Sequence, residues 1–353
     1  MSTMNAPVVT RLERVTAALQ RREADRVPVG LAVGLHGARE LGITLRELFS
    51  DPRNVVEADL RMFAKYGSDI LAATWFAPME HEAWGGEVLW FDDGPPNAGA
   101  PVIRGAESIA RLEAPRVGDL PRGRWMLEAI AEMRRRLGPD VPILGGVVSP
   151  HSLPVMLMGF EAYLNLILER RDLYERLTAT IEEWTVAWGN AQLAAGATAL
   201  AYFDPVASST ILPPDLYRET GFPVARRTIS RLNGPTVTFL ASGRSLPVIP
   251  DLVRTGTLAI GPSVMDDMQE VVAACRGKAT IVGNLNGIEM RHWTPQQAEA
   301  KVRELISAAA PGGGLIVCDN HGEIPIQVPE ETILAISEAV RTWGRFPIAG
   351  GDG

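Results

Sequence analysis

The feature that most constrains the fold is a regular alternation of short apolar segments with longer helical segments along most of the chain. The apolar segments, such as residues 141–148 and 198–203, have the length and the Val, Ile and Leu content of buried strands. Strands that alternate with helices in this way are typical of a parallel sheet covered on both faces. Eight such units are present, and eight close naturally into a (β/α)8 TIM barrel, an α/β fold. The other six expected strands fall at residues 29–36, 69–74, 237–240, 258–260, 280–282 and 315–317.

A doubly wound open sheet is the alternative arrangement of the same elements. That fold would need a Gly-rich phosphate-binding turn after the first strand. The segment at this place, GLAVGLHG at residues 30–37, does not match the GxGxxG pattern. The barrel is therefore the preferred prediction.

Two further segments flank or interrupt the alternation. Residues 11–22 have the amphipathic pattern of a helix that precedes the first strand. Residues 85–103 are rich in Gly and Pro and alternate Val88, Trp90 and Phe91, which predicts a β-ribbon inserted after the second strand, over the mouth of the barrel. We expect residues 1–353 to form a single domain.

Composition excludes several classes of partner. The net charge is −8 and the pI is near 5.3, which argues against nucleic acid or an anionic membrane as the main partner. Cys275 and Cys318 are the two cysteines, so a disulfide framework is not expected. There is no apolar signal core at the start, and no apolar run approaches the ~18 residues that a membrane span needs. We expect a cytoplasmic protein without membrane contact, with a homodimer as an open oligomeric state.

The densest group of polar residues follows the last expected strand. Cys318, Asp319, Asn320, His321 and Glu323 offer a thiol, two carboxylates, an amide and an imidazole within six residues. Burying such groups unpaired would cost several kcal/mol, by rough estimate, so we expect them at a strand mouth that faces a cavity. An imidazole such as His321 can serve as acid, base or metal ligand, with Asp319 or Glu323 setting its tautomer. The alternatives are a loop histidine bonded to a backbone carbonyl and, for Cys318, a small packing residue.

Other candidates follow earlier strands, where the active sites of barrels lie. Asp204 is a candidate general acid, although it could instead cap the turn before Pro205. Glu80 and His81 offer metal-type ligands, or they belong to a solvated loop. The expected substrate-binding residues are Trp75, Phe76, His151, Ser208, Ser242, Arg244 and Asn284.

Four segments give the chain a family resemblance. They are RLERVTAALQRREADRVPV near the start, DPVASSTILPPDLYRETGFP at 204–223, IVGNLNGIEMRHWTPQQAEAKVRELI at 281–306 and GGGLIVCDNHGEIPIQVPEETILAISEAV at 312–340. Together they resemble the uroporphyrinogen decarboxylase superfamily. This superfamily also holds methylcorrinoid-dependent methyltransferases that act on coenzyme M, chloromethane and aryl methyl ethers. The resemblance implies a (β/α)8 barrel for nearly the whole chain.

The chain departs from the decarboxylase pattern at several positions. The family's arginine-bearing run after Pro-Val is replaced by GLAVGLHGARE, with Arg39 as the only arginine nearby. The family's catalytic aspartate falls on Phe76, its tyrosine near Met156 and its serine near Pro205. Only the histidine of a late G-H-G motif has a counterpart, in His321. Without the arginines, charge-assisted pairs worth roughly 1.5–3 kcal/mol each would be lost, so decarboxylation of uroporphyrinogen is not expected.

The thiol-alkylating methyltransferases of the superfamily carry a zinc-binding H-x-C motif after the fifth strand. Here that position is Leu240-Ala241-Ser242, so the thiolate-rich site is absent. The remaining donors fit better the relatives that demethylate O- or N-methyl compounds, in which an acid or a zinc ion activates the leaving heteroatom. The candidate zinc ligands are Glu80, His81, Cys318, Asp319 and His321.

The sequence therefore predicts a methyltransferase that moves a methyl group from a small O- or N-methyl donor to a corrinoid. The chain has no cobalamin-binding D-x-H-x-x-G segment, so the corrinoid would be on a separate protein. The expected catalytic residues are Asp204, His321 and Glu323. Two alternatives stay open: a decarboxylase acting on a small acid, and a non-catalytic barrel that binds a tetrapyrrole or corrinoid.

Overall fold

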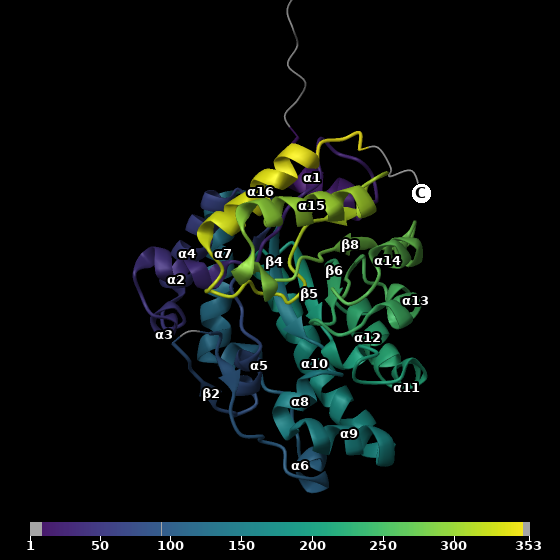
Figure 1. The fold of residues 1–353 in the computed structure, drawn as a ribbon. Helices are drawn as coiled ribbons and strands as arrows, with labels where there is room; N and C mark the ends of the chain where they lie inside the picture. The colour runs from purple at the N-terminus through teal and green to yellow at the C-terminus, as the bar shows by residue number, and fades with distance from the viewer. Residues whose placement is uncertain (1–8, 93, 349–353) are drawn as a thin grey trace, which may run out of the picture.

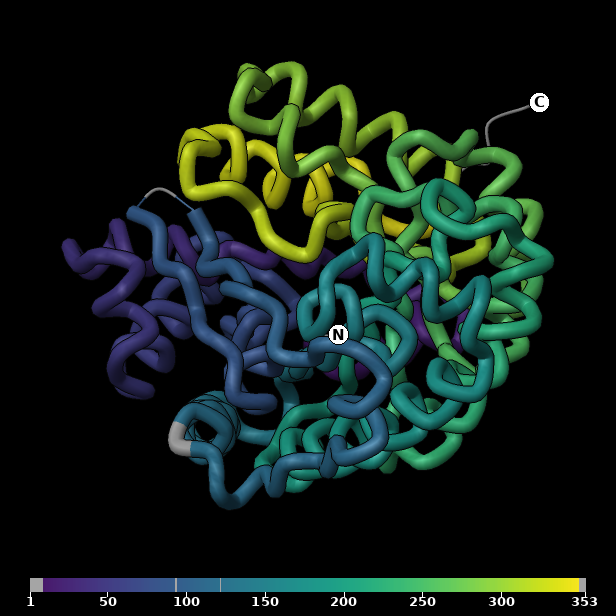
Figure 2. The backbone as a smooth tube through the Cα atoms, turned by 90° about the horizontal axis from the view of Figure 1, so that it is seen from below, coloured from purple at the N-terminus to yellow at the C-terminus, as the bar shows by residue number. Residues whose placement is uncertain are grey.

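The computed structural model describes residues 9–92 and 94–348. Its core is a curled parallel sheet in which the neighbouring strands run in the order β1-β4-β5-β6-β7-β8-β9. Figure 2 shows the chain passing once around a ring, so that its first and last parts lie side by side. The strands are β1 (Leu71–Ala72), β4 (Ile143–Val148), β5 (Ala199–Phe203), β6 (Thr236–Phe239), β7 (Ala259–Gly261), β8 (Thr280–Val282) and β9 (Leu315–Ile316).

The ring is closed by an eighth extended segment around Val29. The N–H of Gly30 donates to the carbonyl of Val317 at 2.9 Å, and the N–H of Val317 donates to Pro28 at 2.9 Å. On the other side, the N–H of Asp69 donates to the carbonyl of Val29 at 2.7 Å. This segment therefore joins β9 to the start of β1, and the predicted (β/α)8 barrel is confirmed.

Helices cover the outside of the sheet (Figure 1). No helix in the described ranges has the length and apolarity that would let it cross a membrane. The α-helices are α1 (Arg11–Leu19), α2 (Gly34–Leu41), α3 (Leu45–Leu48), α4 (Pro52–Tyr66), α5 (Pro78–Ala83), α6 (Ala106–Ala110), α7 (Pro121–Leu137), α8 (Leu153–Met158), α9 (Phe160–Glu169), α10 (Arg171–Ala195), α11 (Pro214–Glu219), α12 (Gly221–Ser230), α13 (Ile249–Arg254), α14 (Met268–Cys275), α15 (Pro295–Ala309) and α16 (Glu330–Trp343).

Helix α1 closes the amino-terminal end of the barrel. A capping box between Thr10 and Glu13 begins the helix. Val15 and Ala18 are buried with the interior side chains of the barrel, among them Val282. The amphipathic helix expected before the first strand is therefore present, and it covers the end of the barrel that lies opposite the expected site.

The segment that follows the extended chain around Val29 differs from the prediction. The sequence predicts extended chain up to His36, whereas α2 begins at Gly34. A Cβ atom at Gly37 would lie 2.4 Å from the Cβ of Ala58, so the glycine permits α2 to pack closely on α4. This glycine has low helix propensity, which concealed a short helix whose apolar face is buried by tertiary packing.

The predicted β-ribbon is confirmed. β2 (Val88–Leu89) pairs with β3 (Asn97–Ala98) in an antiparallel two-stranded sheet. Trp90 anchors it, because its ring centroid lies 5.8 Å from that of Phe49 and 5.7 Å from that of Phe76.

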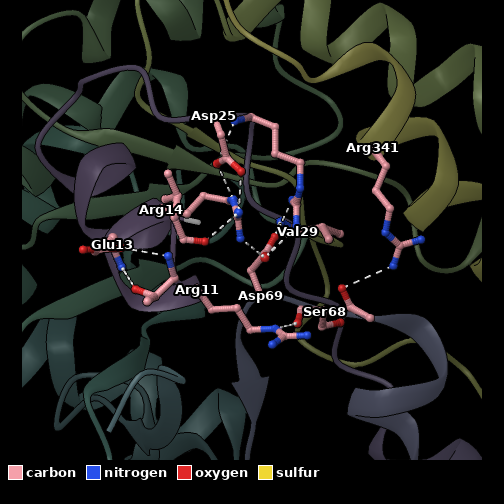
Figure 3. A network of polar contacts seen from close by, with 12 residues as sticks. Arg11, Glu13, Arg14, Asp25, Val29, Ser68, Asp69 and Arg341 are labelled. Carbon is pink, nitrogen blue, oxygen red and sulfur yellow. Dashed lines mark hydrogen bonds and ion pairs between the residues drawn. The ribbon is translucent and has the colours of Figure 1, made fainter. Parts of the chain in front are cut away.

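A buried ion network holds the barrel seam at the amino-terminal end (Figure 3). The carboxylate of Asp69 accepts hydrogen bonds from Arg14 at 2.8 Å, from Arg26 at 2.6 Å and from the N–H of Val29 at 2.9 Å. Arg14 also binds Asp25 at 2.5 Å. One fully buried carboxylate thus connects α1, the extended segment around Val29 and the start of β1.

Candidate active site

A small apolar cavity lies inside the carboxyl-terminal half of the barrel. Its volume is about 80 Å³. It is lined by residues from the extended segment that follows Val29 and from β1, β4, β5, β6, β8 and β9. Glycines make the space: a Cβ at Gly146 of β4 would lie 3.0 Å from the ring of Trp75. Among the described residues that line the cavity, the polar side chains are those of Thr74, Trp75, Cys318 and Glu323, and there is no Lys or Arg.

A stack of three aromatic rings forms one wall of this cavity. Trp75 stacks on Phe203 with a centroid distance of 5.2 Å, and Phe203 stacks on Phe239 at 5.5 Å. The indole N–H of Trp75 is buried and has no partner among the described residues. The wall is therefore apolar, with one free donor.

Glu323 is the acidic group of the cavity. The turn before it requires glycine, because Gly322 has a φ of +88° and a Cβ there would lie 2.7 Å from the ring of Phe203. No hydrogen bond or ion pair of the Glu323 carboxyl is found in the described part of the chain. Burial, and then the charge of Asp319, raises the pKa of Glu323 to about 8. The half-buried side chain faces apolar space, and its raised pKa favours the protonated acid at neutral pH.

Asp319 holds the loop that presents Glu323. One of its oxygens accepts the backbone N–H groups of His321 at 2.9 Å and of Gly322 at 2.8 Å. The expectation that a carboxylate sets the tautomer of the His321 ring is not met, because Asp319 binds the backbone of that residue and Nδ1 of the ring has no partner among the described residues. Burial lowers the pKa of His321, so the ring is neutral at pH 7.

The five expected zinc ligands do not form a metal-binding group. No set of three or more His, Cys, Asp and Glu side chains within residues 9–92 and 94–348 could hold a metal ion. Glu80 instead accepts the N–H of Val148 at 2.9 Å and the indole N–H of Trp184 at 3.2 Å, and burial raises its pKa to about 8. Burial also raises the pKa of the Cys318 thiol well above its usual range. Glu80 is bound to the backbone of β4 and to Trp184 and does not join the donors of the last loop, so this donor set does not fit the expected zinc ion.

Two fully buried candidates lie outside the cavity lining. Asp204, expected as a catalytic acid, accepts the hydroxyl groups of Ser149 at 2.7 Å and Ser152 at 2.6 Å. Nδ1 of His151 lies 3.2 Å from the hydroxyl of Tyr163 and within reach of a second tyrosine, Tyr174, at 3.0 Å. The loop after β4 thus binds Asp204, whereas the ring of His151 lies against α9 and α10.

The remaining expected substrate-binding residues are also absent from the cavity lining, with the exception of Trp75. Phe76 belongs to the core that packs against Phe49 and Trp90. Ser242 and Asn284 bind Ser263 through their backbone carbonyl and side-chain amide, respectively. The side chain of Arg244 is 57% exposed, and the hydroxyl of Ser208 is buried without a described partner.

The sequence analysis missed one polar pair of the site. Thr74 lines the cavity, and its backbone N–H and hydroxyl both donate to Asp59 of α4. Burial raises the pKa of Asp59 to about 7. A usable signal was the acidic residue on the otherwise apolar face of the predicted helix, which contains Ala58 and Met62.

Comparisons with known proteins agree with this architecture. The family model described as uroporphyrinogen decarboxylase (URO-D) matches residues 10–343. A methylcobamide:CoM methyltransferase, MtaA of Methanosarcina barkeri, is 27% identical over 316 residues, which cover 86% of this chain and 91% of the relative. A uroporphyrinogen decarboxylase of Xylella fastidiosa is 26% identical over 359 residues, covering 94% and 99%. The solved structure of a methyltransferase from Methanosarcina mazei has a TM-score of 0.86 at 22% identity, covering 95% and 99%. The chain belongs to the uroporphyrinogen decarboxylase family.

Proposed function

We propose that this protein is a methyltransferase that takes a methyl group from a small O- or N-methyl compound and passes it to a corrinoid on a separate protein. The observation that carries the proposal is the unpaired carboxyl of Glu323 in the apolar cavity, with its pKa raised to about 8. A carboxylic acid that keeps its proton at neutral pH can protonate a leaving oxygen or nitrogen. Glu323 is therefore the general acid of the proposed reaction.

The proposed step uses the proton of Glu323 to activate the leaving heteroatom. The bond between the methyl carbon and the heteroatom breaks, and its electron pair stays on the heteroatom, which receives the proton of Glu323. The corrinoid partner, when bound, supplies the nucleophile that accepts the methyl group. Trp75 and Phe203 hold the donor in a water-poor space, where a proton transfer of this kind is more effective than in water. Glu323 regains its proton from solvent after the product leaves.

The size and polarity of the cavity favour a small, uncharged donor. Its volume of about 80 Å³ is well below the roughly 300–1,000 Å³ of typical ligand pockets, which also argues against a barrel that only binds a tetrapyrrole. The methyltransferase MtaA, whose name records a methyl group carried on a cobamide, is among the relatives. In that name the methylated cobamide is the methyl donor and CoM the acceptor, so the relation supports a corrinoid partner, and transfer to the corrinoid is the reverse direction.

Decarboxylation of a small acid is the second candidate. The match to the decarboxylase of Xylella fastidiosa over 94% of the chain favours it. The cavity does not, because a carboxylate substrate would meet no Lys or Arg among the described lining residues. We therefore rank methyl transfer first.

The test is methylation of a corrinoid protein by small methyl ethers and methylamines, followed by the absorbance change of the corrinoid. Glu323→Gln should lower the rate by about 10²–10⁴-fold, because the amide cannot donate an acidic proton. Glu182→Gln is the matched control, since Glu182 is a buried carboxylate on α10 that pairs with Arg227 and Arg231. The wild-type rate should fall as pH rises through about 8, where Glu323 ionises.

Two outcomes would contradict the proposal. Equal rates for Glu323→Gln and wild type would remove the general acid. Release of carbon dioxide from small acids, with no methylation of any corrinoid protein, would favour the second candidate.

A further inference from the structure

A second apolar cavity lies at the opposite end of the barrel axis, beneath α1. Its volume is about 440 Å³, and it is lined by α1 and by the amino-terminal ends of the strands. Figure 1 shows α1 at one end of the molecule and α8 and α9 at the other. The catalytic cavity and this cavity are therefore arranged along one axis.

The two cavities share a single layer of aliphatic side chains. Ile70, Leu144, Val282 and Ile316 line both of them. Barrels of this type are normally filled by several layers of bulky side chains. Here Gly145 and other small residues stand where the catalytic cavity needs space, so only this layer separates the two ends.

Two members of the shared layer are incompletely packed. Ile70 and Leu144 belong to the interior cluster of the barrel, yet both are only partly buried. A side chain that points into a close-packed barrel would be inaccessible. Their exposure shows that open space reaches the layer along the axis.

The cavity beneath α1 is mostly apolar, and the polar side chains of its lining are those of Thr16, Gln20, Arg21 and Thr198. Val15 and Leu19 of α1 and Val237 of β6 form apolar walls, and Leu258, which is 41% exposed, lies at the rim. Apolar cavities of this kind stay dry and take up molecules such as benzene or xenon. We propose that this cavity binds small uncharged molecules and that the barrel axis is a passage between it and the catalytic cavity.

The need for a passage rests on the proposed function, because it follows from the docking of a corrinoid protein. A corrinoid protein docked at the barrel mouth would cover that opening while the methyl group is transferred. A small donor or its demethylated product then needs another route, and the axis beneath α1 supplies one of matching size and polarity.

The first test is xenon binding in crystals of the full-length protein. Wild type should show one xenon site in each cavity. Val15→Phe should fill the cavity beneath α1 and lose that site while keeping the other. Ala17→Phe is the matched control, because Ala17 is on the same helix and outside both linings, and it should keep both sites. Leu19→Trp fills the same cavity from α1 if Val15→Phe does not fold.

The second test is the KM for a small methyl donor with saturating corrinoid protein. Val15→Phe should raise the KM several-fold, and Ala17→Phe should leave it unchanged. An unchanged KM for Val15→Phe would overturn the passage, and absence of xenon beneath α1 in wild type would overturn the site. If wild type transfers no methyl group but binds xenon in both cavities, the proposed function fails while the binding site stands.

Discussion

The two ends of the barrel hold a carboxyl group in opposite ways. At the amino-terminal end, the fully buried Asp69 is bound by Arg14, Arg26 and the N–H of Val29. At the carboxyl-terminal end, Glu323 lines an apolar cavity with no partner found among the described residues. Asp69 is therefore held in an ion network, whereas burial raises the pKa of the unpaired Glu323 to about 8.

The two carboxyl groups therefore have different roles: Asp69 helps to close the barrel, and Glu323 is available for chemistry. Removing one partner of a buried ion pair is costly, so the Asp69 network stabilises the junction between the extended segment around Val29 and β1. An unpaired buried acid has a raised pKa and a proton available near neutral pH, which is a recurrent property of catalytic sites. The same kind of side chain thus stabilises one end of the barrel and can react at the other.

The largest expected effect comes from breaking the amino-terminal network. Asp69→Asn should lower the free energy of unfolding by about 3–5 kcal/mol, because Arg14 and Arg26 lose the carboxylate that compensates their buried charge. Urea unfolding measures the change. Asp25→Asn is the control: Asp25 also pairs with Arg14, but its side chain is 41% exposed and its loss should cost less. A cost below ~1 kcal/mol for Asp69→Asn would mean that the seam does not depend on this network.

The next effect comes from crowding the carboxyl-terminal cavity. Gly146→Ala places a methyl group 3.0 Å from the ring of Trp75, so the ring must shift. We expect a loss of about 1–3 kcal/mol in stability, together with weaker binding of the methyl donor. Thermal unfolding and the KM measure the two effects. Full stability with an unchanged KM would show that the aromatic wall does not shape the cavity.

A pH-dependent effect, smaller within any one pH unit, should come from the buried acid Glu80. Its pKa is about 8 in the folded protein and 4.5 in a model compound, so folding favours the protonated form. The stability from this group is complete below pH 4.5 and is lost as pH rises toward 8, by about 1.4 kcal/mol per pH unit. Glu80→Gln keeps one of the two acceptor oxygens and cannot ionise, so it should reduce this slope in unfolding measured from pH 5 to 8 and leave the contribution of Glu323. An identical slope in the variant would place the ionisation elsewhere.

The sequence predicted the barrel better than it predicted the site. Alternating apolar strands and helices leave few arrangements, so the seven strands and the closing segment around Val29 were located, although the expected first strand ran too far, into α2. The short helix α2 was missed because Gly37, needed for contact with Ala58, weakened its helical pattern. Position after a strand identifies the edge of the barrel on which a residue lies, but not the direction of its side chain.

Two pairs of residues illustrate that limit. Trp75 and Glu323 both follow strands and line the cavity. Asp204 and His151 follow strands as well, but they bind serine and tyrosine hydroxyls and do not line the cavity. Such contacts come from segments distant in sequence, and no local pattern encodes them.

The most direct test of this account is the ionisation state of Glu323. Infrared difference spectra of wild type and Glu323→Gln isolate the carbonyl band of this one carboxylic acid. The account predicts a protonated acid at pH 7 that titrates near pH 8, in parallel with the loss of methyl transfer. A carboxylate that is already ionised at pH 7, with a pKa near 4.5, would contradict the central claim.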